Sequence, residues 1–441
     1  MSNPASSASP QLKRVLGFWD SVAINVGIVI GVGIFRTQGA IANYVDTGPL
    51  IILTWAVGGL VALAGVFCYA ELSSRYPQTG GTYVYLREAY GKPAAFLYGW
   101  AEFVIMRPGS VAGVAYILIT YLRNFIQLGP EHERWMTIAA IMLFTALNIG
   151  GLHIGTGIQN VLTTLKIAAI VAMAVIIFGV KGIALPGAGT IEAITHGKWQ
   201  GIAPALIPVL WTYGGWHQST FMSGEFKDTR KALPLSLVTS IAIVAALYII
   251  INAAYLRVMT PAEMAGTKAI ASDVFTRMFG GGAGLMVTLA VLISASGALN
   301  STILTGARLP FAVAQDYPRI NWLTKIDPRF DTPLVSFVVN GILSAALVIW
   351  GNFEQLLFFF AFGNWLFFGL TGLSVFKLRG INKAAGNYEM AGYPWMPALF
   401  VLSSFLLCFI TVQSAPRESL FGAFLLLSGI PAYLLVRGKR A

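Results

Sequence analysis

Long apolar stretches alternate with short polar connections along almost the whole chain. A helix that crosses a bilayer core of about 30 Å needs about 20 apolar residues, because each residue adds about 1.5 Å. Twelve stretches predict such spans: 17–42, 49–73, 94–123, 135–150, 158–180, 203–224, 233–257, 284–314, 333–350, 354–377, 395–413 and 419–436. The pattern therefore predicts an all-α polytopic membrane protein, with 12 transmembrane helices in a single domain over 1–441.

Two of these stretches contain closely spaced glycines near their middle. The first has Gly27, Gly31 and Gly33, and the sixth has the run Tyr213-Gly214-Gly215-Trp216. Each glycine costs about 1 kcal/mol relative to alanine in a helix, so both stretches are expected to unwind at mid-membrane. The alternative is that small residues let neighbouring helices approach closely, as a Gly-x-x-x-Gly pair does.

The positions of the two interruptions divide the chain into two groups of five spans. The groups cover 17–180 and 203–377, and two additional helices follow at 395–436. Transporters built from inverted repeats break corresponding helices near the bilayer midplane and bind substrate there. Freed N–H groups suit a carboxylate and freed carbonyl groups suit an ammonium. The two breaks therefore predict a zwitterionic amino acid as the substrate.

Composition and charge narrow the class further. Hydrophobic residues make up 56% of the chain and charged residues 11%, whereas a soluble domain carries roughly 25% charged residues. The net charge is +11, but the basic residues are scattered, which argues against a nucleic-acid partner. About twice as many of them fall on the side of the N-terminus as on the opposite side. The positive-inside rule therefore predicts a multi-pass protein of the cell membrane, plasma or inner, with both termini cytoplasmic and membrane lipid around it. The polar N-terminal stretch does not resemble a signal peptide.

Charged residues inside the predicted spans are few. Lys166 lies near the middle of the fifth span, where an unpaired charge is costly, and this position indicates a functional role unless a tilted helix brings it to an interface. Glu102 and Arg107 share the third span near a predicted kink at Pro108, and are expected to pair although their spacing exceeds the best helical one. Glu71 and Glu225 are expected to form ion pairs with basic residues at helix ends. These ion pairs are expected to contribute to packing or gating.

Several motifs resemble the amino acid–polyamine–organocation superfamily, and within it the L-type amino acid transporters. The motifs, in chain order, are Gly31-Val32-Gly33-Ile34-Phe35, Tyr69-Ala70-Glu71-Leu72, Tyr76-Pro77-Gln78-Thr79-Gly80-Gly81-Thr82-Tyr83, Trp100-Ala101-Glu102, Arg107-Pro108, Tyr213-Gly214-Gly215-Trp216 and Asn252-Ala253-Ala254-Tyr255. The resemblance covers essentially the whole chain. It implies the leucine-transporter fold, with spans 1–5 and 6–10 as inverted repeats.

The resemblance also implies a substrate site at the two breaks. The substrate carboxylate is expected at the N–H groups of Gly31, Val32 and Gly33, and the ammonium at the carbonyl groups of Val29, Trp211 and Gly214. Val32 stands where the family commonly has serine, which leaves only a backbone contact. Trp211 stands where a smaller aromatic residue often forms a lid.

Further positions follow from the same resemblance. His217 replaces a frequent asparagine, and either selects substrate or is satisfied by a neighbouring group. Tyr248 and Trp365 match aromatic residues of the pocket and of gating, although a membrane aromatic is more often packing. The Lys166 ammonium would replace the sodium ion of sodium-coupled relatives and contact carbonyl groups around Gly27 and Ile28. Transport is therefore expected to be independent of sodium.

Two other function classes fit the sequence less well. An intramembrane enzyme needs convergent catalytic groups, yet the four histidines are far apart in the chain and no metal or cofactor site is expected. A channel would need a filter motif, which is absent. Among transport mechanisms, one-for-one exchange is favoured by the resemblance; proton-coupled symport, with Lys166 changing its protonation state, is the alternative.

Substrate and partner are the last expectations. No acidic or free basic side chain stands beside the breaks, so a neutral amino acid is favoured, and Trp211 favours a small one such as alanine or serine. Cys68 and Cys408 lie in apolar stretches, which argues against a disulfide. Eukaryotic L-type members join a heavy chain through a cysteine between spans three and four. The corresponding loop 124–133 has no cysteine, so no disulfide-linked heavy chain is expected, as for a prokaryotic protein that acts alone.

Overall fold

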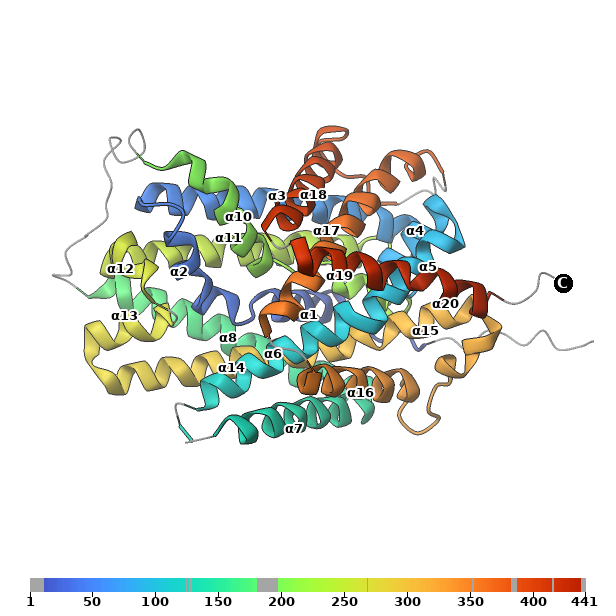
Figure 1. Ribbon diagram of the computed structural model, residues 1–441, viewed down its shortest axis with the longest axis horizontal. Helices are drawn as coiled ribbons and strands as arrows, with labels where there is room; N and C mark the ends of the chain where they lie inside the picture. Colours follow the sequence, from blue (N-terminus) through green and yellow to red (C-terminus); the bar gives the residue numbers. More distant parts are fainter. Residues whose placement is uncertain are drawn as a thin grey trace, which may run out of the picture.

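The fold is built almost entirely from helices. A computed structural model describes residues 12–123, 125–126, 129–180, 197–267, 269–350, 353–381, 387–414 and 416–437. The long helices lie roughly along the longest axis of the molecule (Figure 1). The α-helices are α1 (Phe18–Val29), α2 (Thr37–Ala42), α3 (Gly48–Arg75), α4 (Thr82–Tyr90), α5 (Lys92–Ala101), α6 (Arg107–Leu122), α7 (Pro130–Ile149), α8 (Leu152–Gly179), α10 (Ile202–Thr212), α11 (Ala232–Val258), α12 (Pro261–Ala265), α13 (Ile270–Phe279), α14 (Gly281–Gly306), α15 (Arg308–Gln315), α16 (Leu334–Trp350), α17 (Phe353–Leu378), α18 (Trp395–Ser414), α19 (Pro416–Leu427) and α20 (Gly429–Val436). The tighter or wider turns are η1 (Gly33–Phe35), η2 (Glu102–Met106), η3 (Trp199–Gly201), η4 (Gln218–Glu225) and η5 (Pro318–Thr324).

Seven helical segments of the described chain are long and apolar enough to cross a membrane. They are Gly48–Arg75, Lys92–Leu122, Gly155–Gly179, Ala232–Val258, Gly281–Gln315, Trp395–Gln413 and Ser419–Val436. These segments coincide with seven of the predicted spans and confirm a helical, polytopic architecture. Shorter apolar helices lie at Phe18–Val29 and Leu334–Ile349. The full number of twelve spans and the inverted repeat stay predictions.

Both predicted interruptions are present. α1 ends at Val29, and helical hydrogen bonding resumes only in the single 3₁₀ turn η1, so the predicted span 17–42 is two helices. In the sixth span α10 ends at Thr212, a turn covers Tyr213–His217, and η4 continues as a 3₁₀ helix. Gly31, Gly33, Gly214 and Gly215 therefore lie where the α-helices are interrupted, whereas Gly27 is helical within α1 and permits close packing against α8.

The third span has an irregularity that differs from the expected one. A π-helical turn, η2, interrupts it between α5 and α6, and Pro108 falls in the first turn of α6, where the missing N–H costs nothing. In η2 the Arg107 N–H donates to the Glu102 carbonyl, five residues back. The same turn brings the two side chains together, with Arg107 Nη2 2.6 Å from Glu102 Oε1. The predicted pair is confirmed, and the wider turn explains its unusual spacing.

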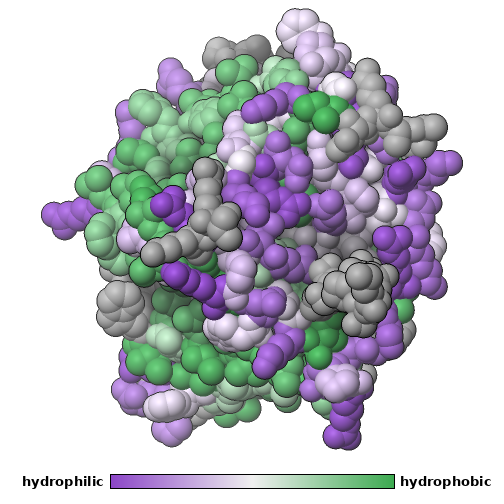
Figure 2. All heavy atoms as spheres, turned by 90° about the vertical axis from the view of Figure 1, so that its right-hand side faces the viewer, coloured by the Kyte–Doolittle hydropathy of each residue, from purple (hydrophilic) through white to green (hydrophobic). Residues whose placement is uncertain are grey.

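The two ends of the helix bundle are covered differently. At one end, which we call the terminal end, Leu16 pairs with Phe226 in a parallel β-bridge and Lys13 binds Asp331. Figure 2 shows hydrophilic residues gathered in the middle of this end, between hydrophobic flanks. At the opposite end lie two short helices, α12, which packs on α2, and α13, which packs on α14 (Figure 1). The sequence pattern did not predict these two helices.

Candidate functional site

The two unwound segments meet at the centre of the bundle. Gly215 has a φ of +105°, a conformation that side chains other than glycine rarely adopt, and Ile28 lies directly against it. A Cβ atom at position 215 would overlap the Ile28 side chain. The second glycine of the predicted run is therefore required by both backbone conformation and contact between the breaks.

For the transport activity that the sequence predicts, Gly215→Ala is expected to reduce the rate by at least about tenfold, because strained backbone of this kind costs of order 1–3 kcal/mol before the overlap is added. The matched control is Gly157→Ala in α8, where a Cβ atom would meet nothing within 4 Å. That change is expected to leave transport unaltered and to stabilise the helix slightly. Uptake of a labelled amino acid into proteoliposomes, normalised to reconstituted protein, measures both; equal rates would contradict the requirement for glycine.

Lys166 is fully buried and binds the first break. Its Nζ atom donates to three carbonyl oxygens: Gly27 at 2.8 Å, Ile30 at 2.7 Å and Ser294 at 2.9 Å. The contact with Gly27 was expected, but the second carbonyl of the first span is that of Ile30, not Ile28, because the chain leaves the helix at this point. The Lys166 ammonium group is thus surrounded by three carbonyl oxygens, as a bound metal cation would be.

The third group around the break comes from α14. Ser294 Oγ donates to the Ile30 carbonyl at 3.0 Å and the Gly31 carbonyl at 3.1 Å. The same helix passes Lys166 closely at Gly297, where a Cβ atom would lie 2.9 Å from Lys166 Nζ. Sequence reasoning missed both residues. Their only signal was a small polar residue followed by glycine inside an apolar stretch.

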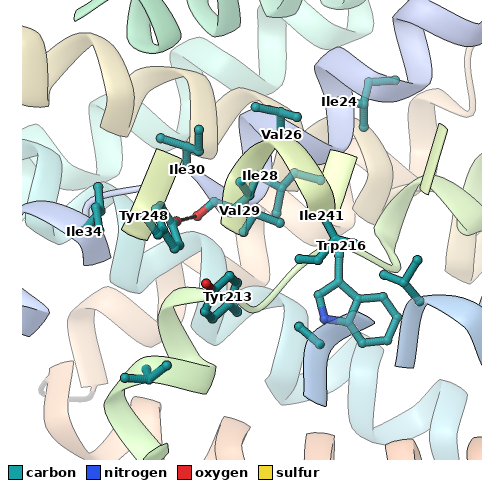
Figure 3. Packing of buried hydrophobic residues seen from close by; sticks show 14 of the residues in the cluster. Ile24, Val26, Ile28, Val29, Ile30, Ile34, Tyr213, Trp216, Ile241 and Tyr248 are labelled. Carbon is teal, nitrogen blue, oxygen red and sulfur yellow. Dashed lines mark hydrogen bonds between the residues drawn. The ribbon is translucent and has the colours of Figure 1, made fainter. Parts of the chain in front are cut away.

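Two of the three predicted ammonium contacts, the carbonyl groups of Val29 and Trp211, already accept hydrogen bonds. Tyr248 Oη donates to the Val29 carbonyl at 2.7 Å (Figure 3), and the Gly31 N–H donates to the same oxygen at 2.8 Å. The Trp211 carbonyl accepts from Gly214 N–H at 3.0 Å. A carbonyl oxygen has two lone pairs, so a substrate ammonium at Val29 would have to replace one of these donors. Tyr248 is therefore placed at the predicted site and competes for it.

The predicted carboxylate contacts divide into two kinds. The Gly31 N–H is engaged by Val29, whereas the N–H groups of Val32 and Gly33 make no hydrogen bond within the described chain. Val32 is the N-cap of η1 and Gly33 is its first residue, positions where N–H groups have no helical acceptor. Thr212 lies against Gly33, 2.8 Å from where a Cβ atom would stand. These two free N–H groups are the available donors for an anion at the break.

A cluster of three aromatic rings packs against the two unwound segments. Trp55 of α3, Tyr213 and Tyr248 form a triangle with ring centroids 5.1–5.8 Å apart. Tyr213 Oη donates to the Trp55 carbonyl at 3.2 Å, and Trp55 Nε1 donates to Gln38 Oε1 at 2.9 Å. All three rings are fully buried. The unwound backbone is thus held in one place by packed rings and hydrogen bonds.

His217 lies in a second cluster of aromatic rings, on the side of the sixth-span break that faces the terminal end. Its ring lies 4.8 Å from Phe368, 5.4 Å from Trp216 and 5.6 Å from Phe221, measured between centroids. Its Nδ1 atom is buried and makes no hydrogen bond within the described chain. Trp216 stacks on Phe368 at 5.4 Å. His217 therefore lies among rings that close the site toward the terminal end.

The predicted residue Trp365 lies beside the end of α10. Trp365 of α17 packs against a small cluster formed by Val61, Leu210 and Leu407. It also meets Phe368 edge-on at 5.5 Å. Trp211, one residue beyond Leu210, is partly exposed. Trp365 thus contacts both the aromatic group around His217 and the end of α10.

Polar side chains connect the third span to η4. Arg107 Nη1 donates to Gln218 Oε1 at 2.6 Å, and Thr305 Oγ1 of α14 donates to the same oxygen at 2.9 Å. Arg107 also binds Glu102, so its charge is balanced. Gln218 was missed in the sequence, because a glutamine just past the break has no distinctive spacing.

Buried ion pairs close the terminal end. Arg308 of α15 binds Glu225 with Nε–Oε1 and Nη2–Oε2 distances of 2.8 and 3.0 Å, and both side chains are almost fully buried. Arg75 binds Glu71 at 3.1 Å. The expectation that Glu71 and Glu225 pair with basic residues is confirmed. With the β-bridge between Leu16 and Phe226, the Arg308–Glu225 pair joins three segments that are distant in the chain.

Comparisons with known proteins place the chain in a family of similar sequences. The amino acid permease family profile matches residues 16–430. The chain is 30% identical over 432 residues to the b(0,+)-type amino acid transporter 1 of Mus musculus, covering 96% of this chain and 88% of that protein. It is 28% identical over 438 residues to the serine/threonine exchanger SteT of Bacillus subtilis (strain 168), covering 98% of each chain. It is also 28% identical to the human Asc-type amino acid transporter 1, covering 98% of this chain and 84% of that protein.

Proposed function

Because the chain belongs to the amino acid permease family, we propose that it exchanges small neutral L-amino acids across a cell membrane by alternating access and without sodium. The observation that carries the proposal is the site itself: two unwound segments held by Lys166, Ser294 and Tyr248. The free N–H groups of Val32 and Gly33 are positioned to receive a carboxylate. The carbonyl groups of Trp211 and Gly214 are the proposed acceptors for the ammonium, together with Val29 after Tyr248 moves.

Independence from sodium rests on Lys166. Its Nζ atom has three carbonyl oxygens within 2.9 Å, the kind of ligand that a sodium ion would need. A fixed ammonium already supplies the positive charge at this point, so no ion has to bind before the break is ordered. A sodium gradient that drives uphill accumulation of an amino acid in proteoliposomes would contradict this part of the proposal.

Exchange is tested by the release of preloaded substrate. Proteoliposomes loaded with labelled serine are expected to release it only when unlabelled serine is present outside, since the empty protein stays closed by its buried contacts. A relative that is named a serine/threonine exchanger aligns over 98% of both chains and supports the choice of serine. Release at the same rate without external amino acid would contradict exchange.

The second mechanism is proton-coupled symport, and one observation favours it. Lys166 is buried and faces only carbonyl groups, so no acidic side chain among its hydrogen-bond partners fixes its charge. A lysine that loses its proton keeps two N–H donors, so at least one of the three carbonyl groups would lose its hydrogen bond. Uptake into empty proteoliposomes that follows an imposed pH gradient would support symport over exchange.

Trp211 provides a test of substrate size. We expect Trp211→Ala to improve transport of leucine relative to alanine by about tenfold, because one or two methylene groups in a pocket are worth about 1–3 kcal/mol each. The control is Trp199→Ala in η3, an exposed tryptophan away from the breaks. Competition by each unlabelled amino acid against labelled serine gives the ratio. An unchanged ratio would remove Trp211 from the pocket.

We also propose that the terminal end faces the cytoplasm, in agreement with the excess of basic residues on that side. Cys68 is buried in α3 and Cys408 lies within α18. The loop 124–133 is only partly described, since residues 124, 127 and 128 lie outside the described residues. Its sequence contains no cysteine, so we propose that the protein functions without a disulfide-linked heavy chain.

A further inference from the structure

A second contact joins α1 to α8, one helical turn from Lys166. Thr163 Oγ1 donates to the Ala23 carbonyl at 2.9 Å, and Gln159 Nε2 donates to the same oxygen at 3.3 Å and to Thr163 Oγ1 at 2.8 Å. Gln159 and Thr163 are both buried. With Lys166 they occupy one face of α8, because residues four and then three positions apart share a helix face.

Gly27 makes this contact possible. In a helix, the side chain of a residue covers the turn before it, so residue 27 lies over the Ala23 carbonyl. A Cβ atom at Gly27 would overlap Gln159 Nε2 and would lie 2.6 Å from Thr163 Oγ1. The glycine therefore leaves the Ala23 carbonyl accessible to the side-chain donors of Thr163 and Gln159.

The contact is anchored deeper in the protein. Gln159 Oε1 accepts from Asn300 Nδ2 of α14 at 3.1 Å, and Asn300 Oδ1 accepts from Asn148 Nδ2 of α7 at 2.9 Å. Gln159 is thereby fixed to two helices that do not unwind. The chain of amides ends on α1, whose connection to the rest of its span is the unwound segment after Val29.

We propose that Gly27, Gln159 and Thr163, which we call the Ala23 contact, are positioning residues that hold the first half-helix closed in the empty protein. The proposal rests on the exchange function above. Lys166 fixes the end of α1 at the break, and the Ala23 contact fixes the helix one turn earlier, so α1 cannot swing away from α8 until both are broken. The Ala23 contact thereby prevents an empty protein from reorienting, which is what makes exchange obligatory.

The test uses Thr163→Val, which keeps the shape of the side chain and removes the hydroxyl. In proteoliposomes loaded with labelled serine, release without external amino acid is expected to rise about tenfold, which corresponds to about 1.4 kcal/mol. The KM for external serine is expected to stay within about twofold of the wild-type value. Thr163→Ser should restore wild-type behaviour. The matched control is Thr164→Val, an exposed neighbour whose hydroxyl bonds only to Asn160 of its own helix.

A second measurement does not depend on transport. It uses Asn25→Cys in a background with Cys68→Ala and Cys408→Ala. Asn25 is buried in α1, and its side chain makes no hydrogen bond within the described chain. In detergent the reaction of the introduced cysteine with a maleimide should be several-fold faster in the Thr163→Val protein. This arm separates failure of the Ala23 contact from failure of the exchange function itself.

If Thr163→Val does not fold, Gln159→Met replaces it, because Asn300 Nδ2 keeps its bond to the Gly155 carbonyl at 3.1 Å. Faster unpaired release and faster labelling in either variant would support the proposal. Unchanged release and labelling, with or without a lower melting temperature, would overturn it and leave Thr163 with a structural role only.

Discussion

Lys166→Met is expected to reduce amino acid exchange to about 1% of the wild-type rate or less. The change removes the donor from three buried carbonyl oxygens, those of Gly27, Ile30 and Ser294. Hydrogen bonds to a charged group contribute about 1.5–3 kcal/mol each, and about 3 kcal/mol in all suffices for a hundredfold loss. Methionine fills a similar volume, so the loss would come from the missing ammonium group and not from a cavity. Exchange of labelled serine in proteoliposomes measures the effect.

The control is Lys227→Met, which removes a lysine side chain that is exposed at the terminal end. It should leave exchange within about twofold of wild type, since exposed charges contribute little. Lys166→Arg tests geometry: its larger head group must fit beside Gly297, where the lysine is already in close contact, and we expect it to be inactive as well. A Lys166→Met protein that exchanges serine at the wild-type rate would show that the ammonium does not order the break.

The local features of the site could be predicted where one residue type carries the signal. Glycines at Gly31, Gly33, Gly214 and Gly215 mark unwound backbone because each weakens a helix by itself. Lys166 could be singled out because a charge at the middle of an apolar stretch needs a partner. In both cases the physical cost is local to the residue, so the sequence alone shows it.

The partners could not be predicted, because they are distant in the chain. Ser294 is 128 residues from Lys166, and Gln218 is 111 residues from Arg107. At such separations the sequence has no periodic pattern that would indicate a contact. The contact with Ile30 in place of Ile28 depends on where α1 stops. The π turn at Glu102 was missed for a related reason: an extra residue in a helical turn leaves no compositional mark. The seven long spans were found because their length alone identifies them.

The second large effect is expected at the ion pair between Arg308 and Glu225. Arg308→Met should lower the free energy of unfolding by about 3–5 kcal/mol, because it leaves the Glu225 carboxylate buried without its partner. The substitution also removes the donor to the Leu304 carbonyl at 2.7 Å. The entropy of unfolding is about 2.1 cal/mol/K per residue, so in a chain of 441 residues each kcal/mol shifts the melting temperature by about 1 °C, and a fall of about 3–5 °C is expected in detergent. Thermal unfolding of the purified protein measures it.

The double variant Glu225→Gln, Arg308→Met separates the ion pair from other effects. Removing both charges avoids the buried unpaired carboxylate, so the double variant should recover much of the lost stability. An exposed pair provides the control: Lys13 and Asp331 have side chains 70% and 48% exposed, and Lys13→Met should cost no more than about 1 kcal/mol. If the single and double variants are equally unstable, packing of Arg308 over Phe337, and not the charge pair, holds the terminal end closed.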